Sequence, residues 1–451
     1  MRKYFGTDGV RGVANTELTC DLAYKLGRAG GYVLAQGDHR VKVVVGKDTR
    51  MSGDMLESAL IAGLMSVGCD IIPVGIIPTP AVAYLTRKYN ADCGVVISAS
   101  HNPMEDNGIK FFNKDGYKLD DEIELEIEKY IEDIEKVDCN PVGENVGVIN
   151  HDHNALRDYV DYLKSIINVD LTGMKVVLDC ANGASYEVAP IVFKELGANV
   201  IDINTSPNGK NINDRCGSTH PEMLQKSVVE NKADLGLAYD GDADRLIAVD
   251  ENGNIVDGDH IMILSAAYLK KKKQLSNDTL VITVMTNIGL NVAAREYGIN
   301  LETTDVGDRY VIEAMKKGNF NLGGEQSGHM IFLDYNTTGD GVLSSLMLSK
   351  IIKEEKKPLS ELASIMSVYP QVLVNVEVKN EVKNKFMEVE EIKNEIARIE
   401  GLMEGSGRVL IRPSGTQPLV RVMLEGKEEG QINELANNLA NLIKKNYRKL
   451  L

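Results

Sequence analysis

Three aspartates alternate with small residues in the segment 240–245, which reads Asp-Gly-Asp-Ala-Asp-Arg. Alternate side chains of an extended or turning backbone point to one side, so the three carboxylates converge. Converging carboxylates repel one another unless a cation lies between them. We therefore predict a metal site at Asp240, Asp242 and Asp244. Mg²⁺ is favoured over Ca²⁺, because few protein ligands together with a phosphate oxygen suit the smaller ion.

Two other interpretations of this acidic segment are possible. Aspartates at positions 1, 3 and 5 also open an EF-hand loop, and Glu251 falls at position 12. Position 6 is Arg245, however, where that loop needs glycine, and the following Leu-Ile-Ala-Val is typical of a strand. An acidic surface turn without metal remains the second alternative.

A second segment exposes a hydroxyl where a strand ends. Residues 97–103 read Ile-Ser-Ala-Ser-His-Asn-Pro, and Pro103 fixes a sharp exit from the apolar run before it. The alternative is an Asn-Pro turn with incidental serines. A serine hydrolase is excluded, because Gly-x-Ser-x-Gly is missing and His101 adjoins Ser100 in the chain. No structural role for the Ser100 hydroxyl is evident, so we expect its removal to leave the fold intact.

A third segment, 323–329, reads Gly-Gly-Glu-Gln-Ser-Gly-His. Its glycines allow the backbone to approach a ligand closely. Glu325, Ser327 and His329 alternate and can face the same way, and a carboxylate with a hydroxyl suits the hydroxyl groups of a sugar. A glycine-rich turn without a ligand is the alternative.

A fourth segment, 412–421, places two arginines around a Ser-Gly-Thr turn between two strands. Arginines, hydroxyls and free backbone N–H groups form a cradle for a phosphate. The alternative is a hairpin turn with solvated arginines. The candidate phosphate-binding residues are Arg412, Ser414, Gly415, Thr416 and Arg421.

Neither common nucleotide-binding fingerprint accompanies these segments. Residues 5–12, Phe-Gly-Thr-Asp-Gly-Val-Arg-Gly, space their glycines as Gly-x-x-Gly-x-x-Gly around Arg11, unlike the dinucleotide motif. The sequence also lacks a Walker A motif, which disfavours an ATP-driven kinase.

The elements that position these segments repeat three times along the chain. Each repeat begins with an apolar strand (within 41–50, 174–183 and 279–287), continues through a helix to a second short strand, and ends with a third strand. The serine, aspartate and glycine-rich segments follow the three third strands. Such sheets bind ligands beyond the carboxyl ends of their strands, so we expect all three segments there.

The repeats predict three similar α/β domains with mixed sheets, followed by a smaller α+β domain with the order β-α-β-β-α. A helix is expected over 384–402 in the last domain. The predicted domains are residues 1–150 with the serine segment, 151–252 with the metal site, 253–366 with the candidate sugar contacts and 367–451 with the candidate phosphate cradle.

Composition limits the partners and the compartment. The net charge of −16 and the aromatic content of 5% argue against nucleic acid and anionic membranes. The six cysteines form no CxxC pair and are predicted to be free thiols. The chain shows no signal peptide and no run of about twenty apolar residues. We therefore expect a cytoplasmic protein.

Taken together, five segments resemble the α-D-phosphohexomutase superfamily, and within it the branch that acts on glucosamine phosphates. The similarity covers essentially the whole chain, and the motifs occur in the family's order. They are residues 5–12, 98–103, 240–245, 324–329 and 412–416.

The resemblance implies an isomerase, an intramolecular phosphotransferase that interconverts glucosamine 6-phosphate and glucosamine 1-phosphate on the route to UDP-N-acetylglucosamine. The family's phosphoserine directly precedes His-Asn-Pro, which selects Ser100. Phosphorylated Ser100 would give a 1,6-bisphosphate, which serves as intermediate and activator, and then recover a phosphoryl group. Mg²⁺ would be held by the three aspartates and a phosphoserine oxygen.

The resemblance also assigns roles to the other candidates. Lys110 and His329 are the candidates for proton transfer, Arg11 and Arg245 steady the phosphoserine, and His101 completes the catalytic set. The sugar contacts are Glu325 and Ser327, and the non-reacting phosphate is held by Arg412, Ser414, Gly415, Thr416 and Arg421.

Two rival functions stay open at this point. A mutase of the same group that acts on glucose or mannose phosphates is the nearest, because nothing in residues 324–329 proves recognition of an amino group. A catalytically idle sensor of sugar phosphates is the other, but it would need neither the serine nor the aspartates. The sequence does not give the oligomeric state, and a homodimer is one open possibility.

Overall fold

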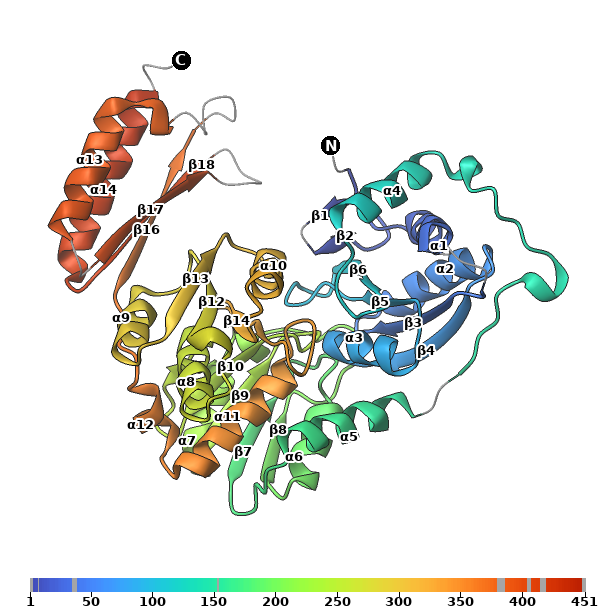
Figure 1. The fold of residues 1–451 in the computed structure, drawn as a ribbon, viewed down its shortest axis with the longest axis horizontal. Helices are drawn as coiled ribbons and strands as arrows, with labels where there is room; N and C mark the ends of the chain where they lie inside the picture. Colours follow the sequence, from blue (N-terminus) through green and yellow to red (C-terminus); the bar gives the residue numbers. More distant parts are fainter. Residues whose placement is uncertain are drawn as a thin grey trace. The chain divides into compact units, whose positions relative to one another are not determined.

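The computed structural model describes residues 3–6, 8–34, 39–151, 154–378, 386–403, 407–413 and 419–447. The chain forms two compact units, one of residues 1–285 with 297–365 and one of residues 286–296 with 366–451. Figure 1 shows the elements of both units. The four domain boundaries expected from the sequence stay predictions.

The first sheet of the first unit has the strand order β1-β2-β6-β5-β3-β4. β3 pairs in parallel with β4 and β5, whereas β6 runs antiparallel to β5 and β2. Its elements are β1 (Phe5–Gly6), β2 (Gly9–Val13), α1 (Cys20–Leu34), β3 (Lys42–Lys47), α2 (Gly53–Met65), β4 (Asp70–Ile76), α3 (Thr79–Lys88), β5 (Cys93–Ile97), β6 (Asp106–Asn113) and α4 (Asp121–Glu132).

Helices cover both faces of this sheet, which explains the uninterrupted apolar strands. On one face Val43 and Val45 share a core with Leu60 of α2. On the other face α3 packs directly against glycines of two strands, Gly46 of β3 and Gly94 of β5. A Cβ at either position would lie 2.6 Å or less from a side chain of α3, so only glycine permits this close approach. Figure 1 shows α1 and α2 on one side and α3 on the other.

The second sheet has the order β11-β10-β9-β7-β8, with β7 parallel to β8 and β9. β10 returns antiparallel to β9, so the acidic segment lies in the turn between these two strands. The elements are α5 (Ala155–Ile167), β7 (Lys175–Asp179), α6 (Val188–Glu195), β8 (Asn199–Ile203), α7 (Glu222–Asn231), β9 (Leu235–Tyr239), β10 (Leu246–Asp250) and β11 (Ile255–Val256). Because residues 246–250 form a strand, the EF-hand alternative is wrong.

The third sheet has the order β13-β12-β14-β15, with β12 parallel to both β13 and β14. Val281 of β12 and Val311 of α10 belong to one apolar cluster, so α10 covers one face of the sheet. The elements are α8 (Gly258–Lys271), β12 (Thr279–Thr283), β13 (Asn300–Thr304), α10 (Asp308–Gly318), β14 (Leu322–Gly324), β15 (Met330–Phe332), α11 (Gly341–Glu355) and α12 (Leu359–Ala363).

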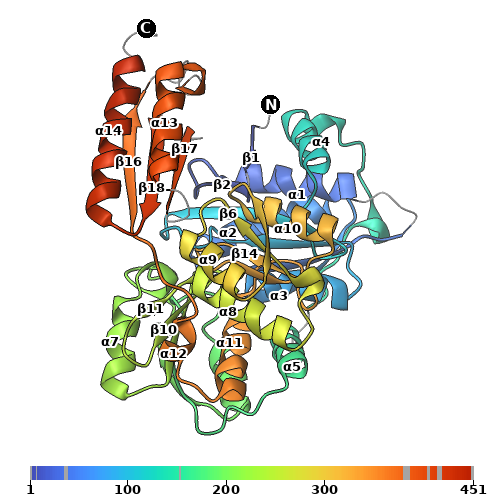
Figure 2. The ribbon, with the colours of Figure 1, turned by 60° about the vertical axis from the view of Figure 1, so that its left-hand side comes forward.

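The second unit is an antiparallel sheet of order β16-β18-β17 with two helices against it. Figures 1 and 2 both show α13 and α14 on the same face of this sheet. Ile392 of α13 and Ile432 of α14 share its core. The elements are α9 (Ile288–Glu296), β16 (Gln371–Glu377), α13 (Glu390–Leu402), β17 (Gly407–Pro413), β18 (Leu419–Gly426) and α14 (Glu429–Tyr447).

The predicted fold class is confirmed, including the β-α-β-β-α order of the last part. One helix start differs from the expectation, because α13 begins at Glu390 rather than at residue 384. A short 3₁₀ turn, Phe386–Glu388, precedes it, and residues 379–385 lie outside the described part of the chain. Glu390 and Glu391 occupy the first turn, where acidic side chains favour a helix N-terminus.

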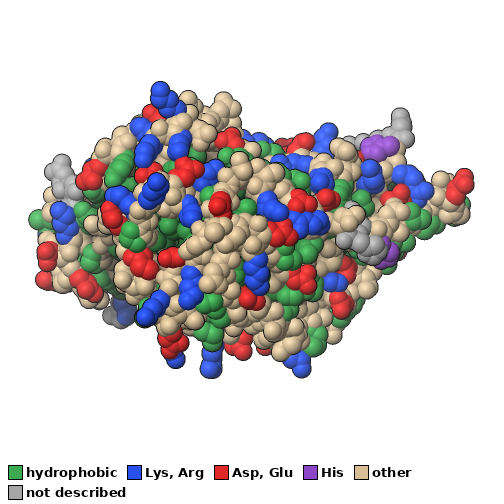
Figure 3. Space-filling view, turned by 90° about the horizontal axis from the view of Figure 1, so that it is seen from below, with side chains coloured by type: hydrophobic (Ala, Val, Ile, Leu, Met, Phe, Trp, Pro, Cys, Tyr) green, Lys and Arg blue, Asp and Glu red, His purple; other side chains and the backbone are tan. Residues whose placement is uncertain are grey.

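The surface and the cysteines agree with the compositional argument. On the face shown in Figure 3, acidic and basic side chains are interspersed rather than gathered by charge. All six cysteines are free, as predicted. Among the described helices, none combines the length and the apolar character that crossing a bilayer requires.

Candidate active site

The serine loop, the acidic loop and the glycine-rich loop each follow the carboxyl end of a strand, β5, β9 and β14 respectively. The predicted location is therefore confirmed for all three. The serine and acidic loops also touch, because a Cβ on Gly241 would lie only 2.5 Å from the carbonyl oxygen of Ser100. Glycine at position 241 thus permits the two loops to meet.

Ser100 is fixed in an unusual backbone conformation. It is buried and has a φ of 52°, in the left-handed region that few residues other than glycine adopt. Its N–H donates to the Ser98 hydroxyl at 3.0 Å, and that hydroxyl donates to Asp48 at 2.6 Å. Arg50 and Asn213 donate to its carbonyl oxygen at 3.1 and 2.9 Å. Strain held this way is typical of functional sites.

The Ser100 hydroxyl reaches the acidic loop directly. Its Oγ donates to Oδ2 of Asp240 at 2.6 Å and lies 3.4 Å from Nδ1 of His101. The expectation that this hydroxyl has no structural role is wrong, because a buried carboxylate depends on it for a hydrogen bond. Ser100 and Asp240 are 140 residues apart in the chain, which is why the sequence did not show the contact.

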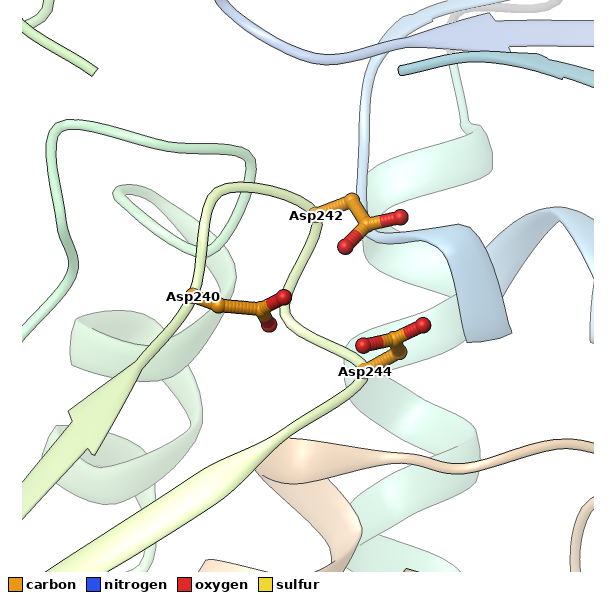
Figure 4. Close-up of side chains that lie close together, drawn as sticks. All are labelled: Asp240, Asp242 and Asp244. Atoms are coloured by element: carbon orange, nitrogen blue, oxygen red, sulfur yellow. The ribbon is translucent and has the colours of Figure 1, made fainter. Parts of the chain in front are cut away.

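The three aspartates converge as predicted. Figure 4 shows their carboxylates pointing toward one another from the loop between β9 and β10. Asp240, Asp242 and Asp244 are all buried, and one oxygen of each lies within 4.8 Å of the others. Within the described part of the chain, Oδ1 of Asp242 and Oδ1 of Asp244 are buried without a hydrogen-bond partner. Such oxygens fit a divalent cation with oxygen ligands.

The ionisation of these carboxylates also favours a cation. Burial raises the pKa of Asp240 well above its ordinary value, and the charges of Asp244 and Asp242 raise it further. Burial likewise raises the pKa of Asp244, but His329 and Lys110 outweigh it and hold the pKa well below the ordinary value. The three carboxylates repel one another, so a cation among them would stabilise the fully ionised set.

Lys110 lies beside the metal candidates on β6. Its Nζ is 2.9 Å from Oδ2 of Asp242 and 3.0 Å from Oδ2 of Asp8, and its side chain is 1% exposed. Burial lowers the pKa of Lys110, but Asp242 and Asp8 outweigh it and raise the pKa above its ordinary value. Lys110 therefore holds a proton on Nζ in this arrangement.

A cleft of about 420 Å³ opens onto Ser100 and Asp244. It brings together residues that the sequence analysis selected from segments far apart in the chain. Its lining includes Arg11, Ser100, Asp244, Arg245, Glu325 and His329.

Two arginines in the cleft offer unsatisfied donors. Within the described residues, Nε of Arg11 and Nε of Arg245 are buried without a hydrogen-bond partner. An anion near Ser100 would supply the missing acceptors, as a phosphate does for guanidinium groups. Burial, together with Arg245 and Arg11, lowers the pKa of His101 to about 4, so its imidazole is neutral beside the serine at neutral pH.

His329 is buried between two carboxylates. Its Nδ1 is 3.6 Å from Asp244 and its Nε2 is 3.7 Å from Asp308. Burial lowers the pKa of His329, but Asp244 and Asp308 outweigh it and raise the pKa to about 9. The N–H of Gly339 lies 3.2 Å from the same Nε2, so this nitrogen also faces a backbone group.

The two sugar-binding candidates of the glycine-rich loop, Glu325 and Ser327, lie in different surroundings. Glu325 lines the cleft, and its Oε1 accepts the N–H of Gly307 at 3.1 Å. Ser327 is exposed and is not among the residues that line the cleft. Gln326 donates to Asp257 at 3.2 Å and so ties the turn to α8. The roles of Glu325 and Ser327 stay predictions.

The phosphate candidates lie in the second unit. Arg412 of β17 and Arg421 of β18 face each other directly in the antiparallel register. Burial and the charge of Arg421 lower the pKa of Arg412. Like charges placed directly opposite destabilise a sheet, so this pair suits an anion site better than a purely structural role. Ser414, Gly415 and Thr416 lie outside the described residues.

Several residues that contact the site were not selected from the sequence. Asp8 belongs to the N-terminal motif of residues 5–12, in which the sequence pointed only to Arg11. Thr79 donates to Oδ2 of Asp242 at 2.7 Å from a Pro-Thr-Pro segment that carried no signal. Lys118 and Asp308 occur in no motif, and they meet only because the fold joins residues 190 positions apart.

The chain matches the phosphoglucomutase/phosphomannomutase family in four successive parts. These are alpha/beta/alpha domain I over residues 2–138, domain II over 157–253, domain III over 257–369, and the C-terminal domain over 373–442. The chain therefore belongs to this family, and the expectation of a phosphohexomutase is confirmed.

Individual relatives support the same assignment. The chain is 80% identical over 443 residues to a phosphoglucosamine mutase of Clostridioides difficile (strain 630), covering 98% of this chain and 99% of that protein. A phosphoglucomutase/phosphomannomutase family protein of Burkholderia thailandensis has a similar crystal structure, with a TM-score of 0.82, 25% identity and coverage of 99% and 98%. The N-acetylphosphoglucosamine mutase of Aspergillus fumigatus, solved with GlcNAc-6P and magnesium, shares the fold at 18% identity, with a TM-score of 0.68 and coverage of 99% and 96%.

Proposed function

We propose that this chain is an isomerase that interconverts glucosamine 6-phosphate and glucosamine 1-phosphate, with a phosphorylated Ser100 and a glucosamine 1,6-bisphosphate intermediate. The 80% identity over nearly the whole chain to a phosphoglucosamine mutase supports the substrate. The observation that carries the chemistry is the hydrogen bond from the Ser100 hydroxyl to Asp240 at 2.6 Å. It places the candidate nucleophile on the acidic triad, beside two unsatisfied arginines.

The reaction consists of two phosphoryl transfers. In the first, the P–O bond to Ser100 Oγ breaks and Oγ takes up a proton, while a P–O bond to the free sugar oxygen forms and the proton of that sugar hydroxyl passes to a base. The bisphosphate then turns over in the site. In the second transfer the other P–O bond of the bisphosphate breaks, Ser100 Oγ gives up its proton to a base and takes the phosphoryl group, and the released sugar oxygen is protonated. The reverse reaction uses the same steps.

The residues of the chain divide this work. Arg11 and Arg245 would hold the phosphoryl group on Ser100, because their Nε groups lack acceptors. Lys110 is the candidate acid, since it carries a proton on Nζ, and His329 is the second candidate for proton transfer. Asp240, Asp242, Asp244 and a phosphoserine oxygen would hold Mg²⁺. When bound, the ion supplies charge neutralisation for the transferring phosphoryl group.

The substrate is tested by kinetics on the purified protein with Mg²⁺. Glucosamine 6-phosphate should give a higher kcat/KM than glucose 6-phosphate or mannose 6-phosphate. A preference for either hexose phosphate would overturn the glucosamine assignment and leave the phosphohexomutase chemistry in place. A protein that binds these sugars without turning any of them over would instead be a sensor.

Replacing Arg421 with Ala should weaken substrate capture without weakening the fold. Loss of a bidentate arginine–phosphate contact costs roughly 2–5 kcal/mol, which corresponds to an increase in KM of about thirtyfold to several thousandfold. The melting temperature should not fall, because Arg412 then loses the like charge opposite it. Steady-state kinetics and thermal melting of Arg421→Ala measure the two effects.

Arg398→Ala is the matched control for this variant. Arg398 lies in the same unit, on α13, and pairs with Glu395 at 2.7 Å at the surface. Its loss should change neither KM nor kcat. If Arg421→Ala behaved like Arg398→Ala, the arginine would be a solvated side chain and the phosphate cradle would be wrong.

The location and the remaining partners follow as part of the proposal. We assign the protein to the cytoplasm because all six cysteines are free, as is usual in a reducing compartment. The small-molecule partner is the hexosamine phosphate itself.

A further inference from the structure

Alternating acidic and basic side chains form a closed ring, and four of its six members line the cleft. The ring runs from Asp8 to Lys110, Asp244, His329, Asp308 and Lys118, and back to Asp8. Half of its members, Lys110, Asp244 and His329, are candidates already placed in the site. The other half has no role in the reaction as described so far.

The ion pairs that form this ring differ in length. Lys110 lies 3.0 Å from Asp8 and 4.0 Å from Asp244. His329 lies 3.6 Å from Asp244 and 3.7 Å from Asp308. Lys118 closes the ring, because its Nζ contacts Oδ1 of Asp8 and Oδ2 of Asp308 directly.

Burial divides the ring into an inner and an outer half. The side chains of Lys110, His329 and Asp244 are 1%, 4% and 8% exposed. Those of Lys118 and Asp8 are 22% exposed. Asp308 is 18% exposed, so all three members of the outer half are partly exposed and the three candidates of the inner half are nearly buried.

Lys118 comes from a different part of the fold than Asp308. It lies in the segment between β6 and α4, whereas Asp308 begins α10. The hydroxyl of Thr337 also donates to Gly116 at 2.5 Å, and Lys316 of α10 lies 4.5 Å from the ring centre of Tyr117. The segment 116–118 therefore contacts the loop that follows β15 and helix α10 independently of the ion pairs.

We propose that Lys118 is a positioning residue for both proton-transfer candidates, acting through Asp8 on Lys110 and through Asp308 on His329. One ammonium group forms an ion pair with two carboxylates, and each of these carboxylates contacts one candidate. Without it, Asp8 and Asp308 lose a shared cation and repel each other, so both candidates lose a fixed partner.

The charge state of Lys118 fits this role. Burial lowers the pKa of Lys118, but Asp308 and Asp8 outweigh it and raise the pKa above its ordinary value, so the side chain is charged at neutral pH. Lys118 is not among the residues that line the cleft with Ser100. A role through its neighbours therefore fits better than direct contact with the sugar phosphate.

The first test is steady-state kinetics of Lys118→Gln with glucosamine 6-phosphate. Because misplacing a reacting group by about 1 Å can cost about a hundredfold in rate, kcat should fall roughly ten- to a hundredfold, with KM changed less than about threefold. Lys118→Arg keeps the charge and should recover most of kcat, and Asp308→Asn should reproduce the loss. A large rise in KM at unchanged kcat would show that Lys118 binds the phosphate itself and would overturn the proposal.

Lys316→Gln is the matched control. Lys316 contacts the same segment through Tyr117 but is not part of the ring. Lys316→Gln removes a contact to the same segment, 116–118, and kcat should stay within about twofold of the wild-type value. An equal loss of kcat in Lys316→Gln and Lys118→Gln would mean that docking alone matters, and the ring would have no separate role.

The inference rests on the proposed function, so the second test does not use turnover. Two-dimensional ¹H–¹⁵N spectra of the histidine rings, with His329→Gln to assign the signal, should show His329 shifted in Lys118→Gln and unchanged in Lys316→Gln. An unshifted His329 would overturn the link through Asp308. If the wild-type protein isomerised none of the hexose phosphates, the proposed function would be wrong. The spectra of Lys118→Gln and Lys316→Gln would then still show whether Lys118 acts on His329 through Asp308.

Discussion

Replacement of Ser100 by Ala should abolish mutase turnover, with a loss of at least roughly 10⁴-fold in kcat, because the variant cannot carry the phosphoryl group. Intact-mass measurement of the wild-type protein should show a fraction with one added phosphoryl group, mapped to Ser100. The variant should show none.

The variant should still fold, at a measurable cost. Ala has the same Cβ as Ser, so the left-handed backbone at φ 52° strains both residues about equally. The loss that remains is the hydrogen bond to Asp240, and leaving a buried acceptor without it costs about 1–3 kcal/mol. Thermal melting should therefore show a lower midpoint and a cooperative transition.

Ser98→Ala is the control within the same loop. Ser98 holds the N–H of Ser100 and donates to Asp48, so its loss should loosen the loop and reduce the rate. It should nevertheless leave the phosphate on Ser100. Full turnover in Ser100→Ala, or a phosphate that maps to Ser98, would disprove the assignment of the nucleophile.

The sequence predicted the parts of this site that depend on local order. Asp240, Asp242 and Asp244 converge because they alternate within one turn, which the spacing alone implies. Ser100 stands at a strand end because an apolar run stops at Ser-x-Ser-His-Asn-Pro. The carboxyl-end rule for such sheets then brought the serine, acidic and glycine-rich loops to the correct edges.

The sequence could not predict contacts that depend on tertiary packing. Lys110 lies on β6, an antiparallel strand outside the three repeats, and a lysine in the middle of a strand is typical of an exposed position. Its burial is tolerated only because Asp8 and Asp242 come to it from other elements. Lys118 and Asp308 likewise pair across 190 residues of chain. No local pattern records such a pair.

Removal of Mg²⁺ is expected to stop turnover in the wild-type protein. In Asp242→Asn the loss of turnover should remain when Mg²⁺ is present. Asp242 offers an unpartnered Oδ1 to the metal, while its Oδ2 accepts from Thr79 and Lys110. Asn keeps the size of the side chain but removes its charge and replaces one oxygen with a donor. Phosphoryl transfer without charge neutralisation loses several kcal/mol of transition-state stabilisation, or about two orders of magnitude or more in rate.

Thermal melting gives a readout of the same site that does not depend on turnover. At a magnesium concentration of about a hundred times Kd, binding stabilises the folded protein by about 2.7 kcal/mol, so the melting midpoint of the wild type should rise clearly on adding Mg²⁺. The midpoint of Asp242→Asn should rise much less. Asp250→Asn is the matched control, because Asp250 is a buried carboxylate at the far end of β10 that caps the turn through Asn252 and Asn254. It should keep the full magnesium response, and an unaltered response in Asp242→Asn as well would make the acidic loop a structural turn.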